Sequence, residues 1–327
     1  MTLRQTLLQA AGRVRATRPD VAARAEGFVR AHACPGGGFA DRSGRPDLYY
    51  TVFGLQTLAA VAPAPLEPGP EGPGHLDPAW DVPSRKRMPR RFRGGLERHR
   101  AYLTAFDADD LDFVHLCCLL RCWALLSDGP ATDARESLPG RLETFRAADG
   151  GYSHVPSAPH STAYGAFLAL GAYQDAGADP PAPDRLAEGL AGLRAADGGY
   201  ANAPGVDVGL VPSTAAAVVT LADLGRAVEP SSLDWLLAQQ HSRGSWPAGP
   251  GLPTADLLST ATALHALGSA GGALDDAARA AALAFVESLA EDVADPAGPA
   301  GFRGHPADTV ADCEYTFYGL LAMGHLT

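Results

Sequence analysis

The sequence has little charge and no paired cysteine motif. Charged residues make up only 19% of the 327 residues, and the net charge is −11. No excess of Lys and Arg is available to neutralise phosphates, so the chain is not expected to bind nucleic acid. The five cysteines include no CxxC pair, so we expect reduced thiols and a cytoplasmic protein.

The sequence also lacks a long hydrophobic run. Its most apolar stretch, Phe113–Leu126, contains His115 and Arg121 and is too short to span a bilayer. The N-terminus has no continuous apolar core of the secretory type. Its Arg-rich start is compatible with a transit peptide or with an amphipathic first helix, and we favour the helix.

A repeat organises what is present. The heptapeptide Arg-Ala-Ala-Asp-Gly-Gly-Tyr occurs at Arg146–Tyr152 and again at Arg194–Tyr200, and a verbatim copy at this distance indicates a repeat protein. Six units share a glycine-rich turn with an aromatic residue, a polar loop and an apolar helix. These inner helices are expected from Tyr49 to about Val61, from Leu111, and over Tyr164–Leu170, Ala215–Leu224, Ala261–Leu267 and Phe317–Met323.

A second set of helices alternates with the first, over Pro183–Arg194, Ser231–Gln240 and Asp275–Leu289. Six helical hairpins that bury their faces only against neighbours form either an open solenoid or a closed ring. We predict the ring: an all-α, (α/α)6 toroid forming a single domain over residues 1–327, with a central cavity. Ser and Thr residues are expected to provide the N-caps of the inner helices.

The second unit is interrupted by a Pro/Gly-rich insertion at about residues 62–95, which ends in Arg85-Lys86-Arg87, Arg90-Arg91 and Arg93. Two interpretations stay open for this basic segment, 85–93. It is a solvated loop, as charge runs usually are, or a flap whose arginines hold an anionic group over the cavity.

The pattern of Gly-Gly-aromatic, spacer, Ser/Thr and apolar helix resembles the repeat of the protein prenyltransferase β-subunit and squalene/terpene cyclase superfamily. The closest pieces are Asp-Gly-Gly-Tyr at 149 and 197 and the segment 301–319. The resemblance covers almost the whole chain. It implies a toroid whose aromatic-lined cavity accepts a long isoprenoid, and either a helical partner subunit or a homo-oligomer.

Protein prenyltransferases bind zinc through an Asp-x-Cys pair and a His, and the resemblance places these ligands at known positions. Asp256 is retained, but Leu258 stands at the Cys position and Tyr315 at the His position. Zinc activation of a thiolate needs all three ligands. We therefore expect no zinc and no other cofactor.

Terpene cyclases of the protonating class use Asp-x-Asp-Asp at the start of an inner helix, and this chain has Asp107-Ala108-Asp109-Asp110 there. The resemblance makes Asp109 the catalytic acid, supported by Asp107 and Asp110, with His115 tuning its proton. The alternative is an acidic helix start that complements the macrodipole. Cyclases of this type generally place the site between two toroidal domains, whereas this chain has one.

Aromatic residues on the inner helices are candidates for the cavity wall, where their faces would stabilise a carbocation, or for plain core packing. A reserve acid site comprises Asp256, Asp312 and Tyr315, around the position of the missing zinc. The predicted lining residues are Tyr50, Phe53, Phe113, Tyr164 and Phe317.

The sequence therefore favours an enzyme that binds an isoprenoid and cyclises it by metal-free protonation. The alternative is a zinc-less binding or scaffold protein that needs a partner on its outer helices. A glycosidase would need two separated carboxylates in a tryptophan-lined groove, and the scattered Trp80, Trp123, Trp235 and Trp246 do not predict one.

Overall fold

The structure is a computed structural model that describes residues 1–61, 90–126, 132–295 and 297–327. Of the predicted insertion, residues 62–89 lie outside this description, as does most of the basic segment 85–93. Among the described residues, no helix is both long enough and apolar enough to cross a membrane.

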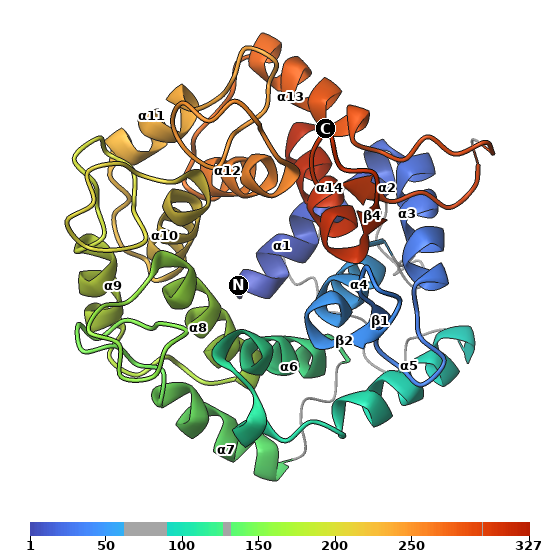
Figure 1. Cartoon of the computed structure of the whole chain (residues 1–327), viewed down its shortest axis with the longest axis horizontal. Coiled ribbons are helices and arrows are strands. Elements are labelled where there is room, and N and C mark those ends of the chain that lie inside the picture. The colour runs from blue at the N-terminus through green and yellow to red at the C-terminus, as the bar shows by residue number, and fades with distance from the viewer. Residues whose placement is uncertain (62–89, 127–131, 296) are drawn as a thin grey trace, which may run out of the picture.

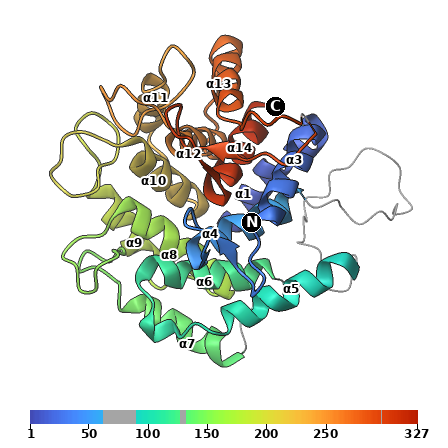
Figure 2. The same cartoon turned by 45° about the vertical axis from the view of Figure 1, so that its right-hand side comes forward.

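The described helices form two concentric rings (Figure 1), which confirms the predicted α/α toroid. Each inner helix packs against the next, and the last packs against the first, so the ring is closed. Figure 2 shows the outer helices following the outside of the ring. The inner helices are α4 (Leu48–Val61), α6 (Phe113–Leu125), α8 (Ala163–Ala176), α10 (Val211–Asp223), α12 (Leu257–Ser269) and α14 (Cys313–Leu326). The outer helices are α3 (Pro19–Ala31), α5 (Arg90–Leu103), α7 (Thr132–Glu143), α9 (Pro183–Ala191), α11 (Pro230–Ala238) and α13 (Asp276–Ser288).

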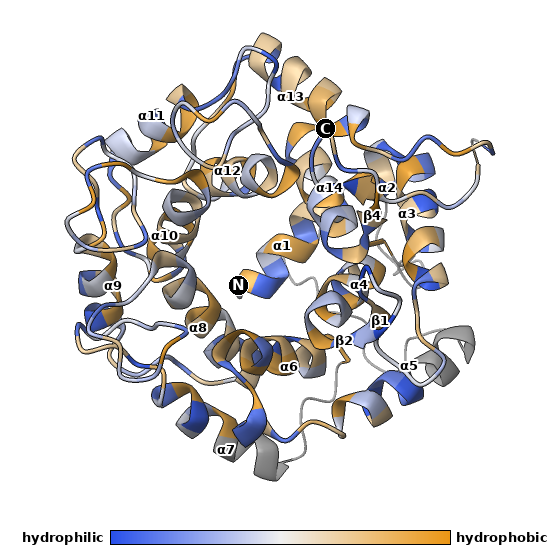
Figure 3. Cartoon of the chain, viewed as in Figure 1, coloured by the Kyte–Doolittle hydropathy of each residue, from blue (hydrophilic) through white to orange (hydrophobic). Residues whose placement is uncertain are grey.

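Hydropathy explains which helices lie inside. The inner helices are apolar along most of their length, whereas the outer helices carry polar residues on the face away from the ring (Figure 3). A helix that is apolar on every side must be covered on every side. The inner helices pack on two inner neighbours and on one or two outer helices, and their remaining side faces the centre of the ring.

The glycine-rich turns are tied to the inner helices by a repeated hydrogen bond. In four units, the backbone amide of the turn aromatic donates to a fully buried threonine at the fourth position of the inner helix. Glycines in α4 and α14 leave room for the rings: a Cβ at Gly54 would lie 2.5 Å from the ring of Phe39. The four donor–acceptor pairs are Phe39–Thr51 (2.9 Å), Tyr200–Thr214 (2.8 Å), Trp246–Thr260 (3.1 Å) and Phe302–Thr316 (3.2 Å).

This arrangement corrects the expected N-caps. Thr162 does cap α8, since its hydroxyl accepts from the amide of Gly165. Aspartates at Asp112, Asp256 and Asp312 instead cap α6, α12 and α14. A carboxylate is the better acceptor at a helix N-terminus, so the threonine one turn later is free to hold the glycine-rich turn.

Short antiparallel hairpins precede two inner helices, and small elements complete the chain. Strand β1 (Phe39–Ala40) pairs with β2 (Pro46–Asp47), and β3 (Phe302–Arg303) pairs with β4 (Ala311–Asp312). A 3-10 helix, η1 (Ala108–Asp110), leads into α6, and α2 (Val14–Thr17) links the first helix to α3.

Helix α1 (Leu3–Gly12) is the predicted amphipathic first helix, and it lies across the centre of the ring (Figure 1). It packs on α14, α4 and α8. The approach to α14 is so close that a Cβ at Gly324 would lie 1.8 Å from the carbonyl oxygen of Ala10. Because Gly324 and the other contacts belong to the last turns of the inner helices, α1 closes the end of the ring where these helices finish.

Candidate functional site

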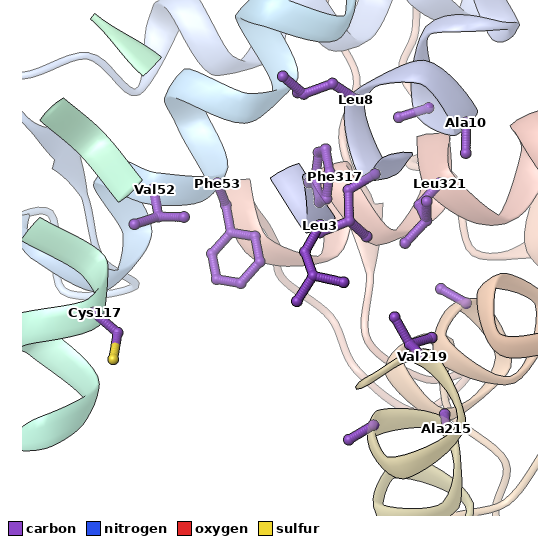
Figure 4. Packing of buried hydrophobic residues seen from close by; sticks show 14 of the residues in the cluster. Leu3, Leu8, Ala10, Val52, Phe53, Cys117, Ala215, Val219, Phe317 and Leu321 are labelled. Carbon is purple, nitrogen blue, oxygen red and sulfur yellow. The ribbon is translucent and has the colours of Figure 1, made fainter. Parts of the chain in front are cut away.

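The centre of the ring encloses a cavity of about 680 Å³. Its wall follows the register of the inner helices. Counted from the first residue of each inner helix, positions 2, 5, 6 and 9 supply most of the lining side chains, and the others come from α1, from the loops and from two further helix positions. Val52, Phe53, Cys117 and Ala215 illustrate how three helices turn their side chains toward the centre (Figure 4).

The register divides the cavity into three layers. The upper layer, position 2, includes Tyr49, Tyr164, Pro212 and Leu258; Tyr164 is 39% exposed, so the cavity opens at this end. The lower layer, position 9, lies nearest α1 and contains Gln56, Arg121, Val219, His265 and Leu321. The middle layer, positions 5 and 6, is apolar and rich in aromatic rings: Val52, Phe53, Cys117, Cys118, Phe167, Leu168, Ala215, Ala216, Thr262, Phe317 and Tyr318.

The predicted lining residues divide into two groups. Phe53, Tyr164 and Phe317 lie on the cavity wall. Phe113 is fully buried against Phe145, with ring centroids 5.3 Å apart, on the side of α6 away from the cavity. Tyr50 lies outside the lining, whereas its neighbour Tyr49 occupies position 2.

A buried carboxyl lies next to the upper layer, where it contacts the wall residue Tyr49 but is not itself part of the cavity lining. Glu314 occupies position 2 of α14, is 9% exposed, and accepts a 2.7 Å hydrogen bond from the hydroxyl of Tyr49. Burial raises the pKa of Glu314 to about 7, although the hydrogen bond from Tyr49 favours the charged form. A large share of Glu314 therefore carries a proton at neutral pH, beside an apolar cavity.

The reserve acid site is held in other interactions. Asp312 caps α14 and also pairs with Arg42, whose Nε lies 2.7 Å from its carboxylate. Asp256 caps α12, with Ser259 donating both its amide and its hydroxyl. Burial raises the pKa of both carboxyls, but these donors favour the charged forms. Tyr315 lies under the Arg42 guanidinium, 5.6 Å from ring centroid to Cζ.

The acidic turn before α6 faces solvent. The side chain of Asp109 is 88% exposed and lies 3.9 Å from Arg141, and Asp110 is also exposed. Asp107 caps η1 by accepting from the amide of Asp109. The Nδ1 of His115 contacts Asp112, 2.9 Å away, and not Asp109. None of these side chains is part of the cavity wall, so the predicted motif and the cavity are separate features.

The residues present do not fit a zinc ion. In the part of the chain that the structure describes, no group of three His, Cys, Asp or Glu side chains gathers around one point. Leu258 lines the upper layer, and the carboxylate of Asp256 is engaged by Ser259. Burial also raises the pKa of the Cys117 and Cys118 thiols, and a metal needs the thiolate.

Sequence reasoning missed Tyr49, Glu314 and Arg121 as site residues. For Arg121 the signal was a lone arginine within an apolar helix. For Tyr49 and Glu314 the signal was a shared register: both are the second residue of an inner helix, like Tyr164. A consistent position count across the repeats would have grouped them.

Comparison with solved structures gives fold-level similarity. The type II terpene cyclase MstE from Scytonema, without ligand, has a TM-score of 0.54 and 14% identity, covering 94% of this chain and 96% of that chain. A variant of MstE in complex with its product merosterolic acid A has a TM-score of 0.55 and 15% identity, covering 99% and 98%. Candida albicans protein geranylgeranyltransferase-I complexed with GGPP has a TM-score of 0.50 and 13% identity, covering 68% and 70%.

No curated protein matches the chain in sequence. The family model of the prenyltransferase alpha-alpha toroid domain does match, over residues 22–82 and 214–326, which together are more than half of the chain. The matched residues include most of α3 and all of α4, α12 and α14. Tyr49 lies on α4 and Glu314 on α14. The chain therefore belongs to the prenyltransferase alpha-alpha toroid family.

Proposed function

We propose that this protein is a terpene-cyclase-like enzyme that binds a long apolar isoprenoid in its central cavity and protonates it from Glu314. The observation that carries the proposal is a buried carboxyl with a raised pKa that is hydrogen-bonded to Tyr49 on the wall of an aromatic-lined cavity. A carboxyl poised near neutral pH is suited to general acid catalysis.

Proton transfer needs a neutral carboxyl, and the hydrogen bond from Tyr49 orients the carboxyl group of Glu314. The hydroxyl of Tyr49 donates to one oxygen of Glu314, which leaves the other oxygen to carry the proton. Transfer of that proton to an alkene or epoxide forms a new C–H or O–H bond and leaves a carbocation. After ring closure the cation loses a proton to water and becomes the neutral product, and the Glu314 carboxylate takes up a proton from solvent before the next turnover.

The middle layer would stabilise the cation. Phe53 lies 6.2 Å from Phe317 and 5.5 Å from Tyr318, measured between ring centroids, and all three rings line the cavity. Aromatic faces attract a cation through their quadrupoles, most strongly where water is excluded. This cluster begins one helical turn below Glu314 on α14, where a cation formed by its proton would develop.

Similarity to MstE supports the proposal at the level of the fold. MstE is described as a type II terpene cyclase and is seen with its product. Because this chain and MstE cover each other almost completely, a cyclase can be built in a chain of this length. The presence of a single toroid therefore does not count against cyclisation.

The alternative, a binding protein that needs a partner on its outer helices, has less support. In the described residues, the large exposed hydrophobic side chains of the ring lie in the loops before α8, α10, α12 and α14, together with Tyr164. Partner subunits that cover a ring usually seat on an exposed apolar face. The described surfaces of the outer helices do not show one.

The test is incubation with geranylgeraniol, geranylgeranoic acid, GGPP and squalene, followed by chromatographic separation and mass spectrometry of the separated compounds. Protonation and deprotonation leave the mass unchanged, so the expected product is an isomer with fewer double bonds. Glu314→Gln is expected to bind the same compounds without converting them. Binding by the wild-type protein with no conversion of any compound would contradict catalysis and favour the binding protein.

A further inference from the structure

The lower layer of the cavity is unexpectedly polar. Three of its side chains, Gln56, Arg121 and His265, can form hydrogen bonds, although the layers above them are mostly apolar. All three occupy position 9 of their helices. A hydrocarbon ligand gains nothing from such groups, and burying them without partners is costly.

Arg121 reaches from α6 toward α8 and is held on two sides. Its Nε donates to Asp175, and its Nη1 donates to the Oε1 of Gln56 at 3.1 Å. Gly171 makes this possible, because a Cβ there would lie 2.7 Å from Nη2. A guanidinium has five N–H groups. The N–H groups of Arg121 that do not take part in these two hydrogen bonds have no hydrogen-bond partner among the described residues. The Arg121 side chain lines the cavity.

The charges around Arg121 do not cancel. Asp175, whose side chain is 1% exposed, also pairs with Arg4 of α1 at 2.9 Å. One carboxylate therefore faces two guanidinium groups, and the cluster of Arg4, Asp175 and Arg121 retains one positive charge. The next carboxylate at this end, Asp223, accepts from Gln174 instead. A buried positive charge in excess is stabilised by an anionic ligand.

His265 adds a second group without a complete set of partners. It is 4% exposed, lines the cavity from α12, and its Nδ1 lies 3.0 Å from Nε2 of His325. Its Nε2 is buried and has no hydrogen-bond partner within the described part of the chain. In the order of the ring, α12 lies opposite α6 (Figure 1), so polar groups face the lower layer from both sides.

We propose that the lower layer is a carboxylate-binding subsite, in which Arg121 holds the anionic end of an isoprenoid acid. This inference rests on the proposed isoprenoid binding and names its substrate class. The carboxylate lies toward α1 and the hydrocarbon chain extends up the middle layer, so its far end lies at the upper layer beside Tyr49, the hydrogen-bond partner of Glu314. Among the described residues, Arg121 is the only guanidinium on the cavity wall, and one guanidinium matches a monoanion better than a diphosphate, which carries at least two negative charges.

The experiment compares two ligands with the same carbon chain. Dissociation constants of geranylgeranoic acid and geranylgeraniol are measured by displacement of the neutral dye Nile red. Wild-type protein is expected to bind the acid about tenfold or more tightly than the alcohol, as a charge-assisted hydrogen bond would provide. Arg121→Gln is expected to remove this preference, because it weakens binding of the acid. The dissociation constant of the alcohol is expected to stay within about twofold of the wild-type value. GGPP is expected to bind less tightly than the acid.

Controls separate the possible failures. Arg226→Gln removes an exposed arginine paired with Asp184 and should leave the preference intact. Arg121→Lys keeps the charge beside Asp175 and should keep part of the preference, so it carries the test if Arg121→Gln does not fold. Equal binding of acid and alcohol by wild-type protein, or tighter binding of GGPP, would overturn the carboxylate subsite alone. Failure of every ligand to bind would overturn the proposed function as well.

Discussion

Two acidic helix starts in this protein have opposite surroundings. The turn before α6 places Asp109 in solvent with an 88% exposed side chain, whereas the start of α14 buries Glu314 to 9% exposure. The start of α14 is covered by Tyr49 of α4 and by Arg42, which pairs with Asp312. The difference teaches that burial among neighbouring helices, and not the acidic motif, creates a carboxyl able to hold a proton near neutral pH.

Turnover offers the largest test of this comparison. Glu314→Gln removes the proton donor while keeping a similar shape, so the rate of cyclisation is expected to fall by roughly 10²–10⁴-fold. Asp109→Asn is the matched change at the exposed turn and is expected to leave the rate within about twofold. Product formation is measured by chromatography coupled to mass spectrometry at equal substrate occupancy. If Asp109→Asn abolished turnover and Glu314→Gln did not, the catalytic acid would lie in the Asp107–Asp110 turn and not at Glu314.

Stability against pH gives the next effect. The pKa of Glu314 is about 7 in the folded protein against an ordinary value of 4.5, so the folded state binds more protons between these values. Glu314 therefore does not change the free energy of unfolding below about pH 4. As the pH rises toward 7, its ionisation lowers the free energy of unfolding by about 3 kcal/mol.

Glu314→Gln lacks this ionisation and should be more stable than wild type above about pH 8, but not at about pH 4. Urea unfolding at both pH values measures the difference. Asp109→Asn should show no such pH-dependent gain. A Glu314→Gln variant that is no more stable than wild type at high pH would contradict the buried ionisable carboxyl.

Substitutions at the start of α14 and at the turn before α6 are expected to differ in their effect on the free energy of unfolding. Thr316→Val removes the buried acceptor for the amide of Phe302, and an unsatisfied buried donor costs about 1–3 kcal/mol of unfolding free energy. Leu116 occupies the equivalent position in α6. Asp110→Asn at the exposed turn is expected to cost less than about 0.5 kcal/mol. Chemical denaturation measures both variants, and equal losses would show that the start of α14 is no more constrained.

The smallest effect concerns Tyr49. Its hydrogen bond favours the charged form of Glu314, so Tyr49→Phe raises the pKa of that carboxyl further. Activity that depends on the protonated acid should then persist to higher pH, with little change in mildly acidic buffer. The pH dependence of the rate measures this shift. If the pH at which activity declines stays the same or becomes lower in Tyr49→Phe, Tyr49 does not influence the pKa of the catalytic acid.

The fold was accessible from the sequence because repetition reveals it. Six copies of the turn and inner helix predicted the closed ring, and the helices lie close to the predicted ranges. The site was less accessible. The motif at Asp107–Asp110 determined the predicted acid, and Glu314 was not among the predicted site residues. The surroundings that change its pKa come from α4, more than 250 residues earlier in the chain.

By itself, the sequence determined the class of the molecule: apolar repeats with glycine-rich turns must bury their faces on one another, and local patterning is sufficient for that. The tertiary structure alone decided which carboxyl is buried, which rings face the cavity, and that α1 closes its lower end. These properties depend on contacts between distant helices, because desolvation and excess charge are set by what surrounds a group and not by its neighbours along the chain.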